Sequence, residues 1–139
     1  MSERIDKAIE NHKKGYNCCQ AVACAFCDLV GMDEETMFRT AEAFGLGMGC
    51  MNGTCGALSG AVMLAGLKNS CGDPSHPVSK GATYRLSSSI LKEFETMNGA
   101  TACRDLKGVE TGVVLRSCGG CVKDAAVLAE KILNLDEVH

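Results

Sequence analysis

The stretch from Gly45 to Leu67 constrains the fold more than any other part of the sequence. Residues 45–53 are rich in glycine and have no apolar period, which predicts a loop. From Thr54 onward the residues are small and apolar and fit a buried helix. Thr54 is a predicted N-cap, so Cys55 falls in the first turn, where the positive end of the helix dipole favours a thiolate.

Small residues leave two faces of this predicted helix almost bare. Gly56 and Gly60 lie four residues apart, as do Ala57, Ala61 and Ala65. Residues at this spacing share a helix face, so another helix, a cluster or a substrate can approach closely there. The alternative is a tightly packed core helix in which Cys55 is only a small hydrophobic side chain.

The rest of the chain favours helices. Hydrophobic residues make up 46 % of the 139 residues, yet Trp is absent and Pro occurs only twice. Apolar residues recur with a helical period in nearly every long segment, which predicts an all-α, compact bundle of about five to six helices in a single domain, residues 1–139. The long helices are expected at 2–14, 17–30, 33–44, 54–69, 79–97 and 118–134, with a short one at 101–108, a loop at 70–78 and an extended loop at 109–116.

Charge and apolar patterning exclude some classes of function. The net charge is −3 and no basic run could follow a phosphate backbone, so nucleic-acid binding is not expected. The N-terminus is charged and lacks the apolar region of a signal peptide. The apolar run at 55–67 is shorter than the roughly 20 residues that span a bilayer. We therefore expect a cytoplasmic protein without a membrane span.

Ten cysteines are the most unusual feature of the composition. In a reducing compartment cysteines are more often metal ligands or redox groups than structural disulfides. Four of them, Cys18, Cys55, Cys103 and Cys118, each fall in the first turn of a different predicted helix. If these helix starts converge, four thiols and four positive dipole ends share one pocket, which stabilises thiolates or their metal complex.

The remaining cysteines are predicted to be less special. Cys24 and Cys27 form a CxxC pair inside a helix, on its more polar side, and are expected to be ordinary thiols. Cys71 and His76 lie in the 70–78 loop and make only a weak metal site. His12, His76 and His139 all lie in surface contexts, which argues against a Cys–His–Asp hydrolase.

The sequence resembles a redox-active protein family named for its Cys, CGAxxG, Cys, Cys pattern (C_GCAxxG_C_C). Residues 55–60, Cys-Gly-Ala-Leu-Ser-Gly, match the hexapeptide. Residues 15–22 resemble the first cysteine element, 103–106 the third, and the segment that starts at Cys118 the fourth. The resemblance covers nearly the whole chain and implies redox activity, with relatives fused to cytochrome-type carriers pointing towards electron transfer.

Three functions remain open at this point. The first is electron transfer through a thiolate-ligated iron–sulfur cluster or other metal, with Cys18, Cys55, Cys103 and Cys118 as ligands and Cys50 and Cys121 as further candidates. Gly56 and Gly60 are candidate cofactor contacts. The second is a metal-free thiol–disulfide oxidoreductase that uses the same four redox thiols. The third is a zinc-binding or structural bundle, which widely spaced cysteines do not favour.

Partners are expected from the same features. A redox function requires a redox partner, of a class that the sequence does not specify. The bare faces of the 54–69 helix could also admit a helix from another copy, so a homodimer is a further expectation.

Overall fold

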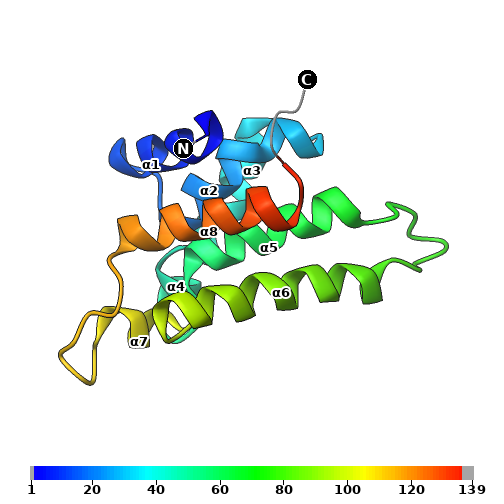
Figure 1. Cartoon of the computed structure of the whole chain (residues 1–139). Helices are drawn as coiled ribbons and strands as arrows, with labels where there is room; N and C mark the ends of the chain where they lie inside the picture. The colour runs from blue at the N-terminus through cyan, green and yellow to red at the C-terminus, as the bar shows by residue number, and fades with distance from the viewer. Residues whose placement is uncertain (1, 136–139) are drawn as a thin grey trace.

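The computed structural model describes residues 2–135, and every regular element in that range is a helix (Figure 1). The prediction of an all-α fold is confirmed for these residues. No helix among them combines the length and the apolar character that crossing a bilayer requires. The elements are α1 (Glu3–Lys13), α2 (Cys18–Phe26), η1 (Cys27–Val30), α3 (Glu34–Ala41), η2 (Glu42–Phe44), α4 (Gly45–Gly49), α5 (Gly56–Asn69), α6 (Lys80–Asn98), α7 (Cys103–Lys107) and α8 (Cys118–Ile132), where η marks a 3-10 helix.

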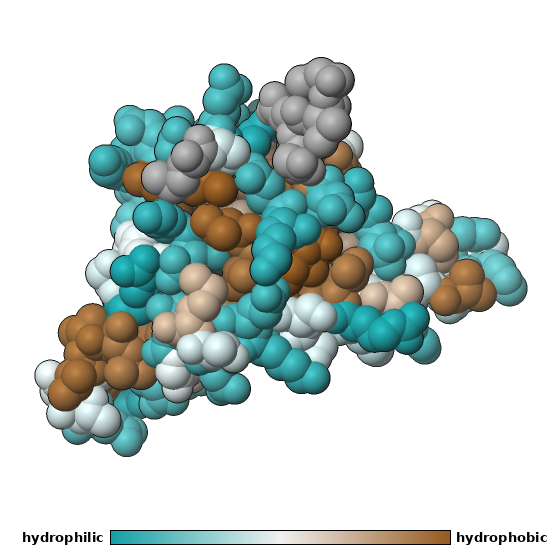
Figure 2. Space-filling model, in the orientation of Figure 1, coloured by the Kyte–Doolittle hydropathy of each residue, from teal (hydrophilic) through white to brown (hydrophobic). Residues whose placement is uncertain are grey.

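The expected number of about five to six helices is slightly low. Seven α-helices remain in the described range even when α4 is set aside, because the residues at the centre of α4 have left-handed backbone angles. The segments at 70–78 and 109–116 contain neither helix nor strand, as the sequence predicts. The 109–116 segment exposes apolar side chains, among them Val113 and Val114 (Figure 2).

Helix α5 lies at the centre of the bundle. It packs against α2, α8 and α6, while α1 covers α2 and α8 (Figure 1). Its small residues Ala57, Ala61 and Ala65 are fully buried in this core. The bare faces of α5 are therefore covered by helices of the same chain, and they no longer provide a reason to expect a homodimer.

Two helices are interrupted where the sequence predicts continuous ones. The 17–30 segment is α-helical only to Phe26, whose φ of −121° breaks the helix before η1 begins. The 33–44 segment likewise changes from α3 to η2 after Ala41. Asn17, Asp33 and Ser117 are the N-caps of α2, α3 and α8, and the side chain of each accepts a hydrogen bond from the first turn of its helix.

The predicted environment of Cys24 and Cys27 is wrong. Cys24 is fully buried and Cys27 is 4 % exposed. Helix α3 packs against α2 and covers the side that appears polar in the sequence, with Cys24 Sγ lying 4.0 Å from the Glu34 carbonyl oxygen. Both thiols belong to the hydrophobic core rather than to a polar surface.

Gly60 marks the closest approach of α5 to α2. A Cβ atom built on Gly60 would lie 2.8 Å from the Cys19 carbonyl oxygen and 3.2 Å from Val22 Cβ. Gly66 lies further along the same helix with nothing within 4 Å of the equivalent position. The two glycines thus form a matched pair, one required for packing and one not.

We predict that Gly60→Ala lowers the free energy of unfolding by about 1–3 kcal/mol, since the added methyl group forces two backbones apart. Gly66→Ala should raise it by about 0.5–1 kcal/mol, because alanine favours the helix and meets no neighbour. Urea unfolding followed by circular dichroism measures both. Equal effects of the two substitutions would contradict the packing of α5 on α2.

Candidate functional site: a cavity lined by five cysteines

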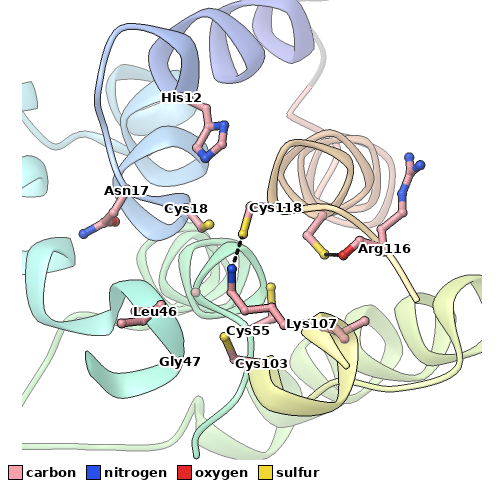
Figure 3. Close-up of a pocket in the computed structure, with 13 residues that line it drawn as sticks. His12, Asn17, Cys18, Leu46, Gly47, Cys55, Cys103, Lys107, Arg116 and Cys118 are labelled. Atoms are coloured by element: carbon pink, nitrogen blue, oxygen red, sulfur yellow. Dashed lines mark hydrogen bonds between the residues drawn. The ribbon is translucent and has the colours of Figure 1, made fainter. Parts of the chain in front are cut away.

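Five cysteines line one cavity of about 210 Å³ at the end of the bundle where α7 meets α5 and α8 (Figure 3). The structure brings together all four cysteines that the sequence places at helix starts, and it adds Cys121. The full lining is His12, Asn17, Cys18, Leu46, Gly47, Cys55, Gly56, Cys103, Leu106, Lys107, Arg116, Cys118 and Cys121.

Helix beginnings place four of these sulfurs. Cys18, Cys103 and Cys118 are the first residues of α2, α7 and α8. Cys55 is itself the N-cap of α5, so the prediction that Thr54 caps this helix is wrong by one residue. Thr54 instead pairs with Ala102 in an isolated β-bridge, and the helix begins after Cys55.

Backbone pairing holds α7 beside the start of α5. The Cys55 N–H donates to the Thr101 carbonyl oxygen at 2.8 Å, and the Cys103 N–H donates to the Gly53 carbonyl oxygen at 3.0 Å. The Arg104 N–H donates to the Met51 carbonyl oxygen at 3.0 Å. These three bonds fix Cys103 opposite Cys55 although 48 residues separate them in the sequence.

A left-handed turn closes the cavity on the side of Cys103. Leu46, Gly47 and Met48 have φ values of 56°, 56° and 66°. A Cβ atom on Gly47 would lie 2.4 Å from Cys103 Cβ, so only glycine allows the turn to approach this cysteine. Left-handed Leu46 and Met48 are costly for residues with a side chain, and such strain gathers at functional sites.

Cys55 has the environment of a thiolate. The pKa of its thiol is lowered to about 7, first by a side-chain hydrogen bond with Cys121 and then, against the effect of burial, by the backbone N–H groups of Ala57 and Leu58. The charge of Lys107 acts in the same direction. The helix start predicted from sequence therefore provides part of the stabilisation, and a second thiol provides the largest part.

The partner thiols remain protonated. The interaction with Cys55, together with burial, raises the pKa of Cys121 far above its ordinary value, so Cys121 stays protonated. The Cys121 thiol lies with its Sγ 4.0 Å from the Arg116 carbonyl oxygen. Burial, followed by the neighbouring sulfurs Cys118 and Cys55, raises the pKa of Cys18 to about 12. Burial also raises the pKa of Cys103, although Lys107 opposes that shift.

Lys107 reaches from α7 into the group of sulfurs (Figure 3). Its Nζ atom donates to Cys118 Sγ at 2.7 Å. Cys118 is also among the neighbours that, after burial, raise the pKa of Cys18. The hydrogen bond to Cys118 raises the pKa of Lys107, which therefore stays charged.

Some residues named from the sequence lie elsewhere. Gly56 lines the cavity, whereas Gly60 does not and instead packs against α2. Cys50 is exposed outside the lining, with its Sγ 3.9 Å from the Gly47 carbonyl oxygen. His12 is the opposite case, because it lines the cavity instead of facing only solvent. His139 lies outside the described residues.

No pattern in the sequence indicates that Lys107, Arg116 or His12 belongs to the site. The glycine after Lys107 signals the end of a short helix, but no pattern in the sequence shows that this lysine points at a cysteine. Cys121 lies one turn after Cys118 and was named only as a further candidate ligand. Its pairing with Cys55 depends on how α8 packs on α5.

The thiols do not form a ready metal site. Among residues 2–135, no group of three or more His, Cys, Asp or Glu side chains is arranged to hold one metal ion. Structural zinc and iron–sulfur sites need four ligands at bonding distance from the metal. Binding one metal ion through several of these thiols would therefore require the sulfurs to move from the positions described here.

Cys71 is a second low-pKa thiol at a separate place. It lies exposed in the 70–78 loop, and hydrogen bonds from Ser79 and from backbone N–H groups lower its pKa to about 7. Its Sγ lies 3.6 Å from the His76 carbonyl oxygen, so the contact with His76 is to the backbone. Reactivity tests on Cys55 must therefore be made in a Cys71→Ser background.

We predict that alkylation of Cys55 in reduced, metal-free Cys71→Ser protein rises with pH around a midpoint near 7, because the thiolate is the reactive form. Cys121→Ala should move this midpoint upward by removing the main hydrogen-bond donor, while the control Cys24→Ala should leave it in place. Peptide mass spectrometry measures each site. Labelling of Cys24 ahead of Cys55, or an unchanged midpoint in Cys121→Ala, would contradict the assignment.

Comparison with known proteins identifies the family. A family model described as "Putative redox-active protein (C_GCAxxG_C_C)" matches residues 16–132, which contain all five cavity cysteines. The name of the family writes its central motif with glycine before cysteine, whereas this chain reads Cys55-Gly56-Ala57. Searches of curated proteins and of solved structures gave no match. The chain belongs to the C_GCAxxG_C_C family, whose description is "Putative redox-active protein".

Proposed function

We propose that this protein is a thiol–disulfide redox protein in which Cys55 is the nucleophile and Cys121 is the resolving thiol. The observation that carries the proposal is that Cys55 and Cys121 line the same cavity, with a pKa lowered to about 7 for Cys55 and a raised pKa for Cys121. A nucleophilic thiol is most effective when its pKa lies near the ambient pH, since it is then both ionised and nucleophilic.

The reaction consumes a disulfide and oxidises the pair. The Cys55 thiolate attacks one sulfur of the substrate, which forms a mixed disulfide and releases the other half as a thiolate. Cys121 then loses its proton and attacks the Cys55 sulfur, which forms the Cys55–Cys121 disulfide and releases the second half. Two electrons pass from the protein to the substrate, and the Cys121 proton passes to a departing thiolate.

The surrounding groups support each step. Backbone N–H groups at the start of α5 stabilise negative charge on Cys55 before the attack. Gly56 lets the start of α5 lie close to the Phe44–Gly45 backbone, since a Cβ atom there would lie 3.1 Å from the Phe44 carbonyl oxygen and 3.4 Å from Cys18 Cβ. The reduced protein contains all ten cysteines as free thiols in the described structure, so the pair is available for oxidation.

An iron–sulfur electron carrier is the second candidate, because five cysteines gather around one cavity. Cys18, Cys55, Cys103 and Cys118 would be its ligands after rearrangement, with zinc as the alternative metal. This candidate needs several sulfurs to surround one metal centre, whereas the dithiol reaction needs only two thiols of the same cavity with unequal pKa values. Visible absorption of protein purified without oxygen, with iron, zinc and sulfide assays, separates the candidates.

We predict that treating the metal-free, reduced Cys71→Ser protein with a small disulfide forms a Cys55–Cys121 crosslink. Cys118 and Cys121 lie between Arg116 and Lys123 and share one tryptic peptide, so variants must distinguish them. Cys121→Ala should stop the reaction at the mixed disulfide on Cys55. Cys118→Ala, the matched control, should still form the crosslink.

Mass spectrometry of intact protein and of non-reduced peptides reads both outcomes. A crosslink that persists in Cys121→Ala and disappears in Cys118→Ala would overturn the assignment of Cys121 as the resolving thiol. Cysteine-bound iron and sulfide in the anaerobic protein, with no crosslink in the metal-free form, would overturn the dithiol function in favour of the cluster.

A further inference from the structure

We propose that the cysteine cavity selects small disulfides that carry a negative charge, and that the Lys107 ammonium recognises this charge. The inference rests on the proposed function and adds a substrate class to it. Three features of the cavity support it: the charges of its lining, the contacts of Lys107 and the cavity volume.

The lining is basic in an acidic protein. The chain has a net charge of −3, yet none of the lining residues, all within the described range, is Asp or Glu. Lys107 and Arg116 both line the cavity. Arg116 is already paired, because its Nε lies 3.0 Å from Asp124 Oδ2 and its Nη2 lies 3.2 Å from Asp124 Oδ1.

Lys107 is the cation that remains for a ligand. Within residues 2–135, no carboxylate lies within ion-pair distance of its Nζ atom, and Cys118 Sγ is its hydrogen-bond partner. An ammonium group has three N–H donors, so one bond to Cys118 leaves donors for an incoming carboxylate or other anion. The same charge acts on Cys18, Cys55 and Cys103.

The fold holds Lys107 in this position. Helix α7 ends at Lys107, and Gly108 reverses the chain with a φ of 69°. A Cβ on Gly108 would lie 2.3 Å from the Val113 carbonyl oxygen, so the following loop packs directly against the turn. The Leu115 N–H donates to the Leu106 carbonyl oxygen at 2.9 Å and fixes the loop to α7.

The space limits the size of the substrate. About 210 Å³ is below the roughly 300–1,000 Å³ of pockets that enclose drug-sized ligands. Leu46, 48 % exposed, and Leu106 provide apolar walls. A small disulfide with a short acidic arm fits these features, with one sulfur at Cys55 and its carboxylate at Lys107. Cys55 forms the new bond and the other half leaves as a thiolate, as in the proposed reaction.

Three symmetrical disulfides test the inference: dithiodipropionate is anionic, bis(2-hydroxyethyl) disulfide is neutral and cystamine is cationic. Rates of mixed-disulfide formation at Cys55 are measured for each in the Cys71→Ser protein, with and without Lys107→Met. We expect Lys107→Met to slow the anionic reagent roughly tenfold relative to the neutral one, since it removes one charge at close range. In Lys107→Met the rate with the cationic reagent should rise relative to the rate with the neutral one. Lys107→Arg should keep the wild-type ratios between reagents.

Ratios between reagents isolate recognition from reactivity. For each reagent, the rate of Lys107→Met is divided by the rate of the wild type, and these quotients are compared between reagents. A change in the reactivity of the Cys55 thiolate alters all three quotients equally, and differences between the leaving thiols do not enter them. Lys92→Met, which removes an exposed lysine of α6 outside the cavity, is the matched control and should change no ratio. Added salt should reduce the anionic preference of the wild type.

Equal slowing of all three reagents by Lys107→Met would overturn the inference and leave the dithiol function intact. The same holds if added salt leaves the ratio of anionic to neutral rates of the wild type unchanged. A failure of the proposed function appears differently, as the absence of the Cys55–Cys121 crosslink with every reagent. Circular dichroism of Lys107→Met and Lys107→Arg checks that both variants keep the helical fold.

Discussion

Backbone pairing between residues 51–55 and 101–104 is the interaction on which the cysteine cavity depends. Three hydrogen bonds, two of which form the β-bridge between Thr54 and Ala102, join the end of the glycine-rich segment to the start of α7. Without them, Cys103 and Lys107 would have no fixed relation to Cys55, since α7 is only a short helix between two loops. The left-handed turn through Gly47 is part of the same arrangement, because it lets residues 51–53 reach the start of α7.

Unequal thiol environments follow from this arrangement. The positive end of a helix favours a thiolate, whereas burial favours the neutral thiol. At Cys18 and Cys103 burial is the larger effect, and the pKa of each thiol is raised. Cys55 differs because a second thiol donates to it in addition to two backbone N–H groups. One ionised sulfur beside one protonated sulfur is the state from which a dithiol begins thiol–disulfide exchange.

Local sequence signals predicted much of the fold and part of the site. Asn17 and Ser117 are strong N-caps, so the positions of Cys18 and Cys118 at helix starts follow from neighbouring residues alone. The position of Cys55 was predicted to within one residue, and the error came from a long-range contact of Thr54 with Ala102. Convergence of the starts could be expected only as a hypothesis, because it depends on how the helices pack.

Contacts between distant segments could not be predicted in the same way. The burial of Cys24 depends on α3 folding over α2, and the pairing of Cys121 with Cys55 depends on α8 lying against α5. The contact of Lys107 with Cys118 joins residues of α7 and α8 across an irregular loop. The glycines of the hexapeptide divide between two tasks, with Gly56 at the cavity and Gly60 between helices, which spacing alone does not distinguish.

The most direct test of the account is a crystal structure of the reduced protein, grown and frozen without oxygen. The account predicts that the sulfurs of Cys18, Cys55, Cys103, Cys118 and Cys121 face one cavity. It also predicts contact between Cys55 and Cys121 and between Lys107 Nζ and Cys118 Sγ. Cys121 turned away from Cys55, or Cys103 and Cys118 directed to separate surfaces, would contradict it.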